Sequence, residues 1–178
     1  MRREQLEHVL RAASTVVGER DVLVIGSQAV LASIPDGRLP PEATTSIEAD
    51  LAFFDDPGDE KADQVDGSIG ELSRFHETYG YYAQGVSVRT AILPIGWMER
   101  LIPLDTTGTE PARGLCLEAH DCVVSKLVAG RGKDRDFASA LLREGLVDAS
   151  VLLERIDMLP EVHGAQKERL RAWVDAHR

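Results

Sequence analysis

The chain has 178 residues, of which 43% are apolar and 28% are charged, and its formal net charge at pH 7 is −10. This length suits one domain with a sizeable core, or one domain with a helical appendage, and the negative charge excludes extensive non-specific binding to nucleic-acid backbones. No apolar run reaches the roughly 18 residues that cross a membrane, and residues 1–21 lack the apolar core of a signal peptide. We therefore expect a cytoplasmic protein without a membrane partner.

Helical and strand patterns alternate in the first third of the chain. Apolar residues at helical spacing predict an amphipathic helix over residues 3–18, and "VLVI" at residues 22–25 predicts a buried strand. After Gly26, "SQAVLAS" resumes helical spacing with Ser27 as the expected N-cap, and a loop rich in Pro and Gly follows. Alternation of apolar and polar residues then predicts a strand over residues 46–54.

The middle of the chain gives weaker patterns. Residues 55–67 are acidic and rich in turn formers, so they are expected to form a connection. Residues 68–79 suggest a short helix, and residues 81–94 offer two strand-like halves around Gly85. Residues 95–104 suggest a turn and a short amphipathic piece.

The last third of the chain changes to mostly helical patterns. Breaks are expected near residues 130–132 and at Gly145, Asp148 is expected to cap a further helix, and residues 161–178 are expected to form the last one. The sequence therefore predicts an α+β fold with a small mixed sheet flanked by helices. Residues 1–112 form this core, and residues 113–178 form a mainly helical part, a C-terminal bundle packed on it.

Two cysteines and a histidine lie close together in "CLEAHDC". Cys116 and Cys122 are too few for a disulfide framework. Their spacing around His120 fits no common zinc motif. We predict that both are small buried thiols.

The Gly26-Ser27 pair stands where the first strand turns into the following helix. Such a corner presents unpaired backbone N–H groups and a hydroxyl at the positive end of the helix dipole, which favours an anion. Gly26 has no Cβ, so a phosphate could approach the backbone closely. The alternative is a plain tight turn with a capped helix.

Glu48 and Asp50 lie two residues apart on the predicted second strand, so both side chains project from one face. Two carboxylates on one face repel each other unless a cation or solvent lies between them. Mg²⁺ prefers carboxylate and phosphate oxygens. The alternative is an edge strand with a solvated acidic face.

Together, "GSQAVLAS", the Pro-rich loop and "TTSIEADLAFF" resemble the signature of the nucleotidyltransferase superfamily related to DNA polymerase beta. The resemblance covers about residues 20–55. It implies that Gly26 and Ser27 bind the triphosphate of a nucleoside triphosphate, and that Glu48 and Asp50 hold Mg²⁺ or Mn²⁺.

A second resemblance lies in the helical third. "DCVVSKLVAGRGKDRDF", residues 121–137, resembles the Lys-Leu-x-Ala helix and trailing Asp-x-Asp of the AbiEii and MenAT nucleotidyltransferase toxins, and of an uncharacterised bacterial family close to them. It implies that Lys126 supplies a positive charge for the phosphates, with Arg131 beside it. Asp134 or Asp136 would anchor Lys126 or act as a base, and the resemblance favours Asp136. The alternative is a helix pair that exposes a mixed-charge turn.

The chain departs from the family pattern at two places. Glu48 stands where the family has Asp, and no third carboxylate is found on the later strand-like segment, where Arg89 and Thr90 stand. In polymerase-like enzymes that third carboxylate is the general base. Lys126 and Asp136 are therefore essential to a catalytic interpretation.

Two functions from different classes follow. The first is a metal-dependent nucleotidyltransferase that moves a nucleoside monophosphate to an acceptor hydroxyl, on the 3′ end of a tRNA or on a protein. By resemblance, it would be a toxin with a cognate antitoxin. The second is a catalytically inactive module of the same fold that binds a nucleotide or a protein partner.

Overall fold

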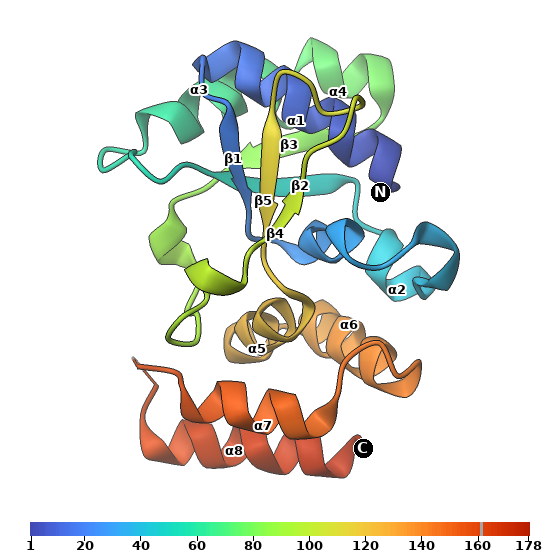
Figure 1. Ribbon diagram of the computed structural model, residues 1–178, viewed down its shortest axis with the longest axis vertical. Coiled ribbons are helices and arrows are strands. Elements are labelled where there is room, and N and C mark those ends of the chain that lie inside the picture. Colours follow the sequence, from blue (N-terminus) through green and yellow to red (C-terminus); the bar gives the residue numbers. More distant parts are fainter. Residues whose placement is uncertain (161) are drawn as a thin grey trace.

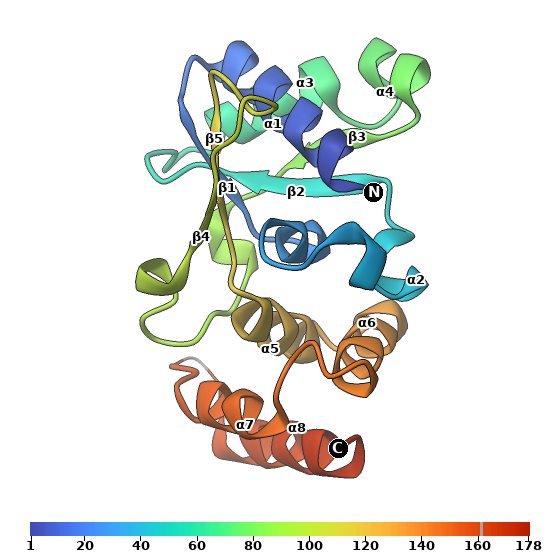
Figure 2. The ribbon, with the colours of Figure 1, turned by 45° about the vertical axis from the view of Figure 1, so that its right-hand side comes forward.

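A computed structural model describes residues 1–160 and 162–178 of the chain. The elements form layers along the long axis of the molecule (Figures 1 and 2). Helices α1, α3 and α4 cover one face of a β-sheet, and α5 and α6 lie on the other side of it. The hairpin of α7 and α8 packs beyond α5 and α6. None of the helices in the described residues has the length and apolar character needed to cross a membrane.

The α-helices of the described residues are α1 (Arg3–Val17), α2 (Pro41–Thr44), α3 (Glu60–Ile69), α4 (Arg74–Tyr79), α5 (Ala119–Ala129), α6 (Gly132–Arg143), α7 (Ala149–Asp157) and α8 (Gly164–Ala176). The strands are β1 (Asp21–Val24), β2 (Glu48–Ala52), β3 (Tyr82–Gly85), β4 (Ile102–Leu104) and β5 (Arg113–Cys116). Short 3₁₀ helices are η1 (Ser27–Ala32), η2 (Asp36–Arg38), η3 (Val88–Thr90) and η4 (Met98–Arg100).

The strands form one mixed sheet in the order β3-β2-β1-β5-β4. β1 pairs antiparallel with β2 and parallel with β5, and β2 pairs parallel with β3. The predicted α+β fold with a small mixed sheet flanked by helices is confirmed. β5 falls in residues 113–116, so the mainly helical part that the sequence predicts begins with a strand of the sheet.

β1 lies in the middle of the sheet, and its position explains its continuous apolar run. Val22, Leu23 and Val24 are completely buried, as expected for a strand covered on both faces. The apolar stripe predicted for the first helix is also buried against this core and consists of Leu6, Val9, Leu10 and Ala13. Alternation of buried and half-buried residues appears at the start of β2, as predicted.

Several expectations for the middle of the chain are wrong. The acidic segment 55–67 contains most of α3, because Ala62, Val65 and Ile69 supply a buried stripe at helical spacing. The single helix expected over residues 68–79 is interrupted at Gly70, where α3 ends, and α4 starts after Ser73. The second strand-like half of residues 81–94 is not a strand; it contains η3.

The corner after β1 also differs in detail from its prediction. The segment beginning at Ser27 is a 3₁₀ helix, and Gly26 occupies its N-cap position. Ser27 is therefore the first residue of η1, and its hydroxyl is not used to cap a helix. That leaves the hydroxyl available on the surface of a pocket.

The two cysteines and His120 serve the packing of α5. Cys116 and Cys122 are completely buried, as predicted, and burial raises the pKa of each thiol to about 12. His120 shares a hydrogen bond of 2.7 Å with Glu118 through Nδ1, and its Nε2 accepts a bond of 2.9 Å from the backbone N–H of Asp148. Asp148 caps α7, as predicted.

A buried ion-pair cluster fastens the α7–α8 hairpin to the rest of the molecule. Asp121 of α5 is completely buried, and the guanidinium of Arg100 in η4 binds it at 2.8 and 3.1 Å. Arg155 of α7 lies 3.2 Å from the same carboxylate. The segments η4, α5 and α7, which are distant in sequence, therefore meet at the Asp121 carboxylate. The sequence patterns did not predict this cluster.

Candidate functional site

A pocket of about 690 Å³ opens between the sheet and helices α5 and α6. Its lining comes from the β1–η1 corner, β2, β3, the segment after β3, the C-terminal half of α5 and the start of α6. Of the residues predicted for the site, Ser27, Glu48, Asp50, Lys126 and Arg131 line this pocket.

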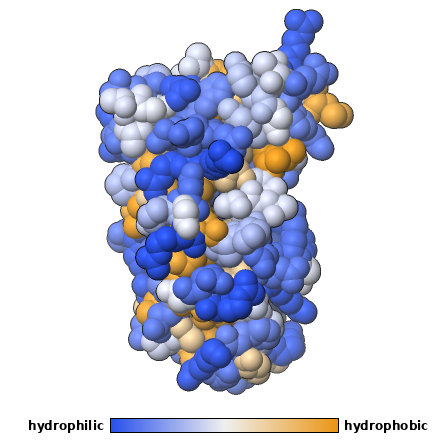
Figure 3. All heavy atoms as spheres, turned by 90° about the vertical axis from the view of Figure 1, so that its right-hand side faces the viewer, coloured by the Kyte–Doolittle hydropathy of each residue, from blue (hydrophilic) through white to orange (hydrophobic). Residues whose placement is uncertain are grey.

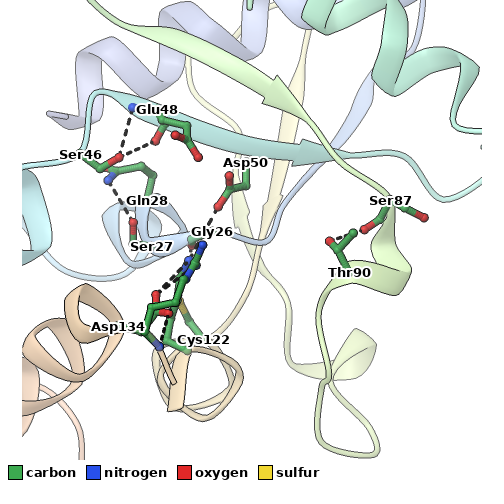
Figure 4. Close-up of polar contacts among 12 residues, drawn as sticks. Gly26, Ser27, Gln28, Ser46, Glu48, Asp50, Ser87, Thr90, Cys122 and Asp134 are labelled. Carbon is green, nitrogen blue, oxygen red and sulfur yellow. Dashed lines mark hydrogen bonds and ion pairs between the residues drawn. The ribbon is translucent and has the colours of Figure 1, made fainter. Parts of the chain in front are cut away.

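The two carboxylates of β2 project into the pocket from the same face of the strand, as predicted (Figure 4). In the register with β3, Glu48 lies opposite Tyr82 and Asp50 lies opposite Gln84. The Tyr82 hydroxyl donates a hydrogen bond of 3.0 Å to Glu48 Oε2. Burial, together with this bond, raises the pKa of Tyr82 to about 12, so the phenol stays protonated and fixes the Glu48 side chain.

The pKa of Asp50 is raised to about 6. Burial of the carboxyl is the largest cause, a hydrogen bond with Glu48 adds to it, and the Lys126 ammonium partly offsets both. Two ionised carboxylates this close repel each other in a partly desolvated pocket. A divalent cation between them would relieve the repulsion, so the donor set fits Mg²⁺ or Mn²⁺ held by two carboxylates and by substrate phosphates.

Gly26 lies directly against the carboxyl group of Asp50. A Cβ at residue 26 would overlap Asp50 Oδ2 and come within 2.6 Å of its Cγ, far inside van der Waals contact. Glycine is therefore needed at the corner because the Asp50 carboxyl packs on its backbone. Whether a phosphate also approaches this backbone stays a prediction.

Gln28, which follows the Gly-Ser corner, supports Ser27 from inside the protein. Its side chain is completely buried, and its Nε2 donates a long hydrogen bond of 3.4 Å to Ser27 Oγ. Its Oε1 has no hydrogen-bond partner among the described residues. Sequence reasoning missed Gln28, although a polar residue within a buried apolar run is a signal that could have identified it.

Lys126 brings a positive charge from the last turn of α5 into the pocket. Its Nζ lies 3.8 Å from Asp50 Oδ2 and 3.9 Å from Asp134 Oδ1. Asp134 is only 2% exposed, and Arg131 binds it through Nε at 2.7 Å and through a terminal nitrogen at 3.2 Å. The start of α6 therefore holds the Lys126 ammonium between two carboxylates.

The structure places Asp134 at the pocket and leaves Asp136 outside it. Asp136 is exposed and does not line the pocket. The two residues are about 200° apart around a helix, so only one of them can face the core. The buried positions Phe137, Ala138 and Leu141 share the face of Asp134. This apolar spacing in the sequence indicates that Asp134 faces the core and Asp136 does not.

The strand beside Asp50 is β3, and the segment with Arg89 is not a strand. Arg89 is exposed and lies 3.5 Å from Asp59, in an ion pair outside the pocket. Gln84 is the residue opposite Asp50. The neighbouring strand β3 therefore presents a neutral amide beside the Asp50 carboxyl, and the acid expected by analogy with polymerase-like enzymes is absent from the described residues of this strand.

A family model described as "Nucleotidyltransferase of unknown function (DUF6036)" matches residues 4–171. The chain belongs to the DUF6036 family. This match covers nearly the whole chain and supports the predicted nucleotidyltransferase superfamily. No curated protein and no solved structure matches the chain.

Most cationic and acidic groups of this DUF6036 pocket lie on different sides. The acidic oxygens of Glu48 and Asp50 lie on the sheet side, whereas the cationic groups of Lys126 and Arg131 lie on the side of α5 and α6, together with the carboxylate of Asp134 that pairs with both. Such an arrangement binds a cation and a polyanion together, because each neutralises charge that the other leaves uncompensated.

Proposed function

We propose that the chain is a metal-dependent nucleotidyltransferase that transfers a nucleoside monophosphate from a nucleoside triphosphate to an acceptor hydroxyl. The observation that carries this proposal is the convergence of the β2 carboxylates, Ser27 and Lys126 on one pocket. Lys126 Nζ lies 3.8 Å from Asp50, so the phosphate-binding charge adjoins the cation site. Membership in a nucleotidyltransferase family supports the same reaction class.

Glu48 and Asp50 would hold the cation. When bound, Mg²⁺ or Mn²⁺ would neutralise phosphate charge and stabilise the charge that develops as the phosphoryl group transfers. Tyr82 orients Glu48 through the 3.0 Å hydrogen bond, and Gly26 leaves room for Asp50. In the described residues, no cluster of three or more His, Cys, Asp or Glu side chains forms a cation site, so substrate phosphates would complete the coordination shell.

The triphosphate would lie between η1 and the turn that joins α5 to α6. Ser27 would donate its hydroxyl hydrogen to a phosphate oxygen, because its Oγ already accepts from Gln28 Nε2. Lys126 would supply a point charge, and the exposed Arg131 and Lys133 at the pocket rim would add to it. Asp134 would keep Lys126 in place.

In the reaction, the acceptor oxygen forms a bond to the α-phosphorus, and the bond from that phosphorus to the bridging oxygen breaks. Pyrophosphate leaves with the bond electrons toward Lys126 and the rim cations, and the hydroxyl proton passes to water. Phosphoryl transfer has a loose transition state, so positioning and charge stabilisation contribute most of the rate. This explains how the site could work without a third carboxylate on β3.

The acceptor would be the 3′ end of a tRNA or a hydroxyl on a protein, and the biological role would be that of a toxin restrained by a cognate antitoxin. The resemblance of residues 121–137 to the AbiEii and MenAT toxins supports these finer assignments. A catalytically inactive module that binds nucleotide or a protein partner is the second candidate. The neutral Gln84 opposite Asp50 favours it.

The test is transfer of label from α-³²P-labelled nucleoside triphosphates with Mg²⁺ or Mn²⁺, using total tRNA and a bacterial protein extract as acceptors. Labelling by the wild type that is lost in Asp50→Asn supports the enzyme. Tight nucleotide binding without transfer to either acceptor supports the inactive module. If the wild type neither binds nucleotide nor transfers label, the proposed function is wrong.

A further inference from the structure

The two walls of the pocket differ in charge. The cationic residues that line it, within the described part of the chain, come from α5, the turn after it and the start of α6: Lys126, Arg131 and Lys133. Among the lining residues that the structure describes, the one carboxylate on the same wall is Asp134, so this wall stays net positive. The opposite wall is formed by β3 and the segment that follows it, and its lining side chains are uncharged: Gln84, Val86, Thr90, Ala91 and Ile92. The polyphosphate therefore has one electrostatically favoured wall, and the other suits a neutral group.

Asp50 adjoins both walls, because its Oδ2 lies 3.8 Å from Lys126 Nζ on the cationic wall and its register partner on β3 is Gln84 of the neutral wall. β2 lies between β1, which leads into Ser27, and β3, which carries Gln84. In Figure 4, Asp50 lies between the Gly26 corner and the turn of Ser87 and Thr90. A group bound at β3 therefore meets the cation site from the side opposite to the triphosphate.

Gln84 is the residue of the neutral wall that lies next to the cation site. It is the register partner of Asp50 in the parallel pair of β2 and β3, and neighbouring strands lie about 4.8 Å apart. It shares its strand face with Tyr82, whose hydroxyl reaches Glu48. The Gln84 side chain is exposed in the pocket, so its amide is accessible to a ligand.

The backbone that carries Gln84 is fixed. The N–H of Gly85 donates a hydrogen bond of 2.7 Å to Asp66 Oδ1 in α3. A Cβ at residue 85 would overlap the backbone carbonyl of Ala62, so α3 packs directly behind the end of β3. A side chain on such a rigid strand can hold a substrate group in one position, which is what a bound nucleophile requires.

We propose that Gln84 binds the acceptor hydroxyl and aligns it for attack, an assignment that rests on the proposed function. In an in-line displacement the nucleophile approaches from the side opposite to the leaving group. Pyrophosphate leaves toward the cationic wall, so the hydroxyl approaches from β3. Gln84 Oε1 accepts the hydroxyl hydrogen bond and orients an oxygen lone pair toward phosphorus, and Nε2 donates to a neighbouring oxygen of the acceptor.

A neutral amide at this position can orient the hydroxyl but cannot act as a general base. A carboxylate at residue 84 would add a third negative charge beside Glu48 and Asp50 and would compete for the cation. The amide has no proton affinity near neutral pH, so Gln84 orients the hydroxyl without taking its proton, which passes to water as the oxygen–phosphorus bond forms. The site thereby selects acceptors by hydrogen bonding.

The experiment compares Gln84→Ala with Gln64→Ala, which makes the same change at an exposed glutamine of α3 outside the pocket. Transfer is measured against the concentration of total tRNA or protein extract, whichever the wild type labels. Binding of an α,β-methylene triphosphate analogue with Mn²⁺ is measured by calorimetry. We expect Gln84→Ala to lower kcat/KM for the acceptor by about 10- to 100-fold and to change analogue affinity by less than about twofold. Gln84→Asn should recover part of the loss, and Gln64→Ala should match the wild type.

Three results would overturn the proposal in distinguishable ways. If Gln84→Ala weakens analogue binding as much as it lowers kcat/KM, Gln84 contacts the nucleoside, and the proposed function stands. If acceptor kinetics do not change, Gln84 has no role in acceptor binding. If the wild type binds the analogue without transferring label, or does neither, the failure lies in the proposed function itself.

Discussion

The ammonium nitrogen of Lys126 lies 3.8 Å from Asp50 Oδ2, so a helix from the last third of the chain neutralises a carboxylate on the second strand. Two substrate components would each bind one partner of this ion pair. A cation would bind Asp50, and a phosphate would bind Lys126. Binding of both together exchanges one ion pair for two.

Replacing Asp50 by Asn should remove transfer while stabilising the metal-free fold at alkaline pH. The folded pKa of about 6 is raised from 3.8, so the stability linked to this carboxyl is fully present below pH 3.8 and is lost as pH rises through 6. Between pH 5 and pH 8, the free energy of unfolding of the wild type should therefore fall by about 1 kcal/mol relative to that of Asp50→Asn. Urea unfolding with EDTA at both pH values measures this difference. An equal effect of the substitution at both pH values would contradict it.

Replacing Lys126 by Met should weaken nucleotide binding. The substitution keeps an unbranched side chain that is one heavy atom shorter and removes the charge, so we expect an affinity lower by about 10- to 100-fold for the methylene analogue with Mn²⁺. Calorimetry measures the affinity, and Lys167→Met in α8, outside the pocket, is the matched control. Similar affinities for both variants would show that the phosphates do not contact Lys126.

Asp134→Asn and Asp136→Asn form a pair that separates the two carboxylates of α6. Asp134 is buried and binds Arg131 at 2.7 Å, so its change should destabilise the fold by about 1–3 kcal/mol and lower transfer by displacing Lys126. Asp136 is exposed, so its replacement should change the free energy of unfolding by no more than about 0.5 kcal/mol. Thermal unfolding and the labelling assay measure both. A larger loss of transfer in Asp136→Asn would restore the assignment that the resemblance favours.

Gln28→Met should separate stability from function. The change removes a buried amide whose Oε1 lacks a partner among the described residues, and an apolar group of similar shape should leave the free energy of unfolding equal or higher. Ser27 Oγ loses its donor, so its hydroxyl becomes free to rotate, and nucleotide affinity should fall several-fold. Urea unfolding and calorimetry on the same samples test this. A less stable variant with unchanged affinity would assign Gln28 a purely structural role.

Local patterns predicted the elements that carry the site. The continuous apolar run of β1, the alternation in β2 and the Gly-Ser pair between them depend on neighbours in sequence, and the structure has strands at both places. Glu48 and Asp50 were expected on one face, because the repeat of two residues in a strand requires it. They do line the same pocket.

Features that depend on distant contacts were not predicted. The sequence does not show that β3, rather than a later segment, pairs with β2, so Gln84 was overlooked beside Asp50. The choice of Asp136 over Asp134 followed a resemblance, whereas the buried face of α6 decides which residue reaches the pocket. The acidic residues 55–67 look like a loop, because α3 exposes most of its surface and buries only one narrow stripe.

The parallel pairing of β5 with β1 has a consequence for dissecting the molecule. Residues Asp21 to Val24 of β1 pair with residues Arg113 to Cys116 of β5. A fragment that stops before β5 would therefore expose one edge of β1, with its backbone amides unpaired. Such a fragment would aggregate or recruit a foreign strand before it bound any ligand. Residues 1–112 therefore do not contain the whole sheet, because its fourth strand in the spatial order comes from residues 113–116.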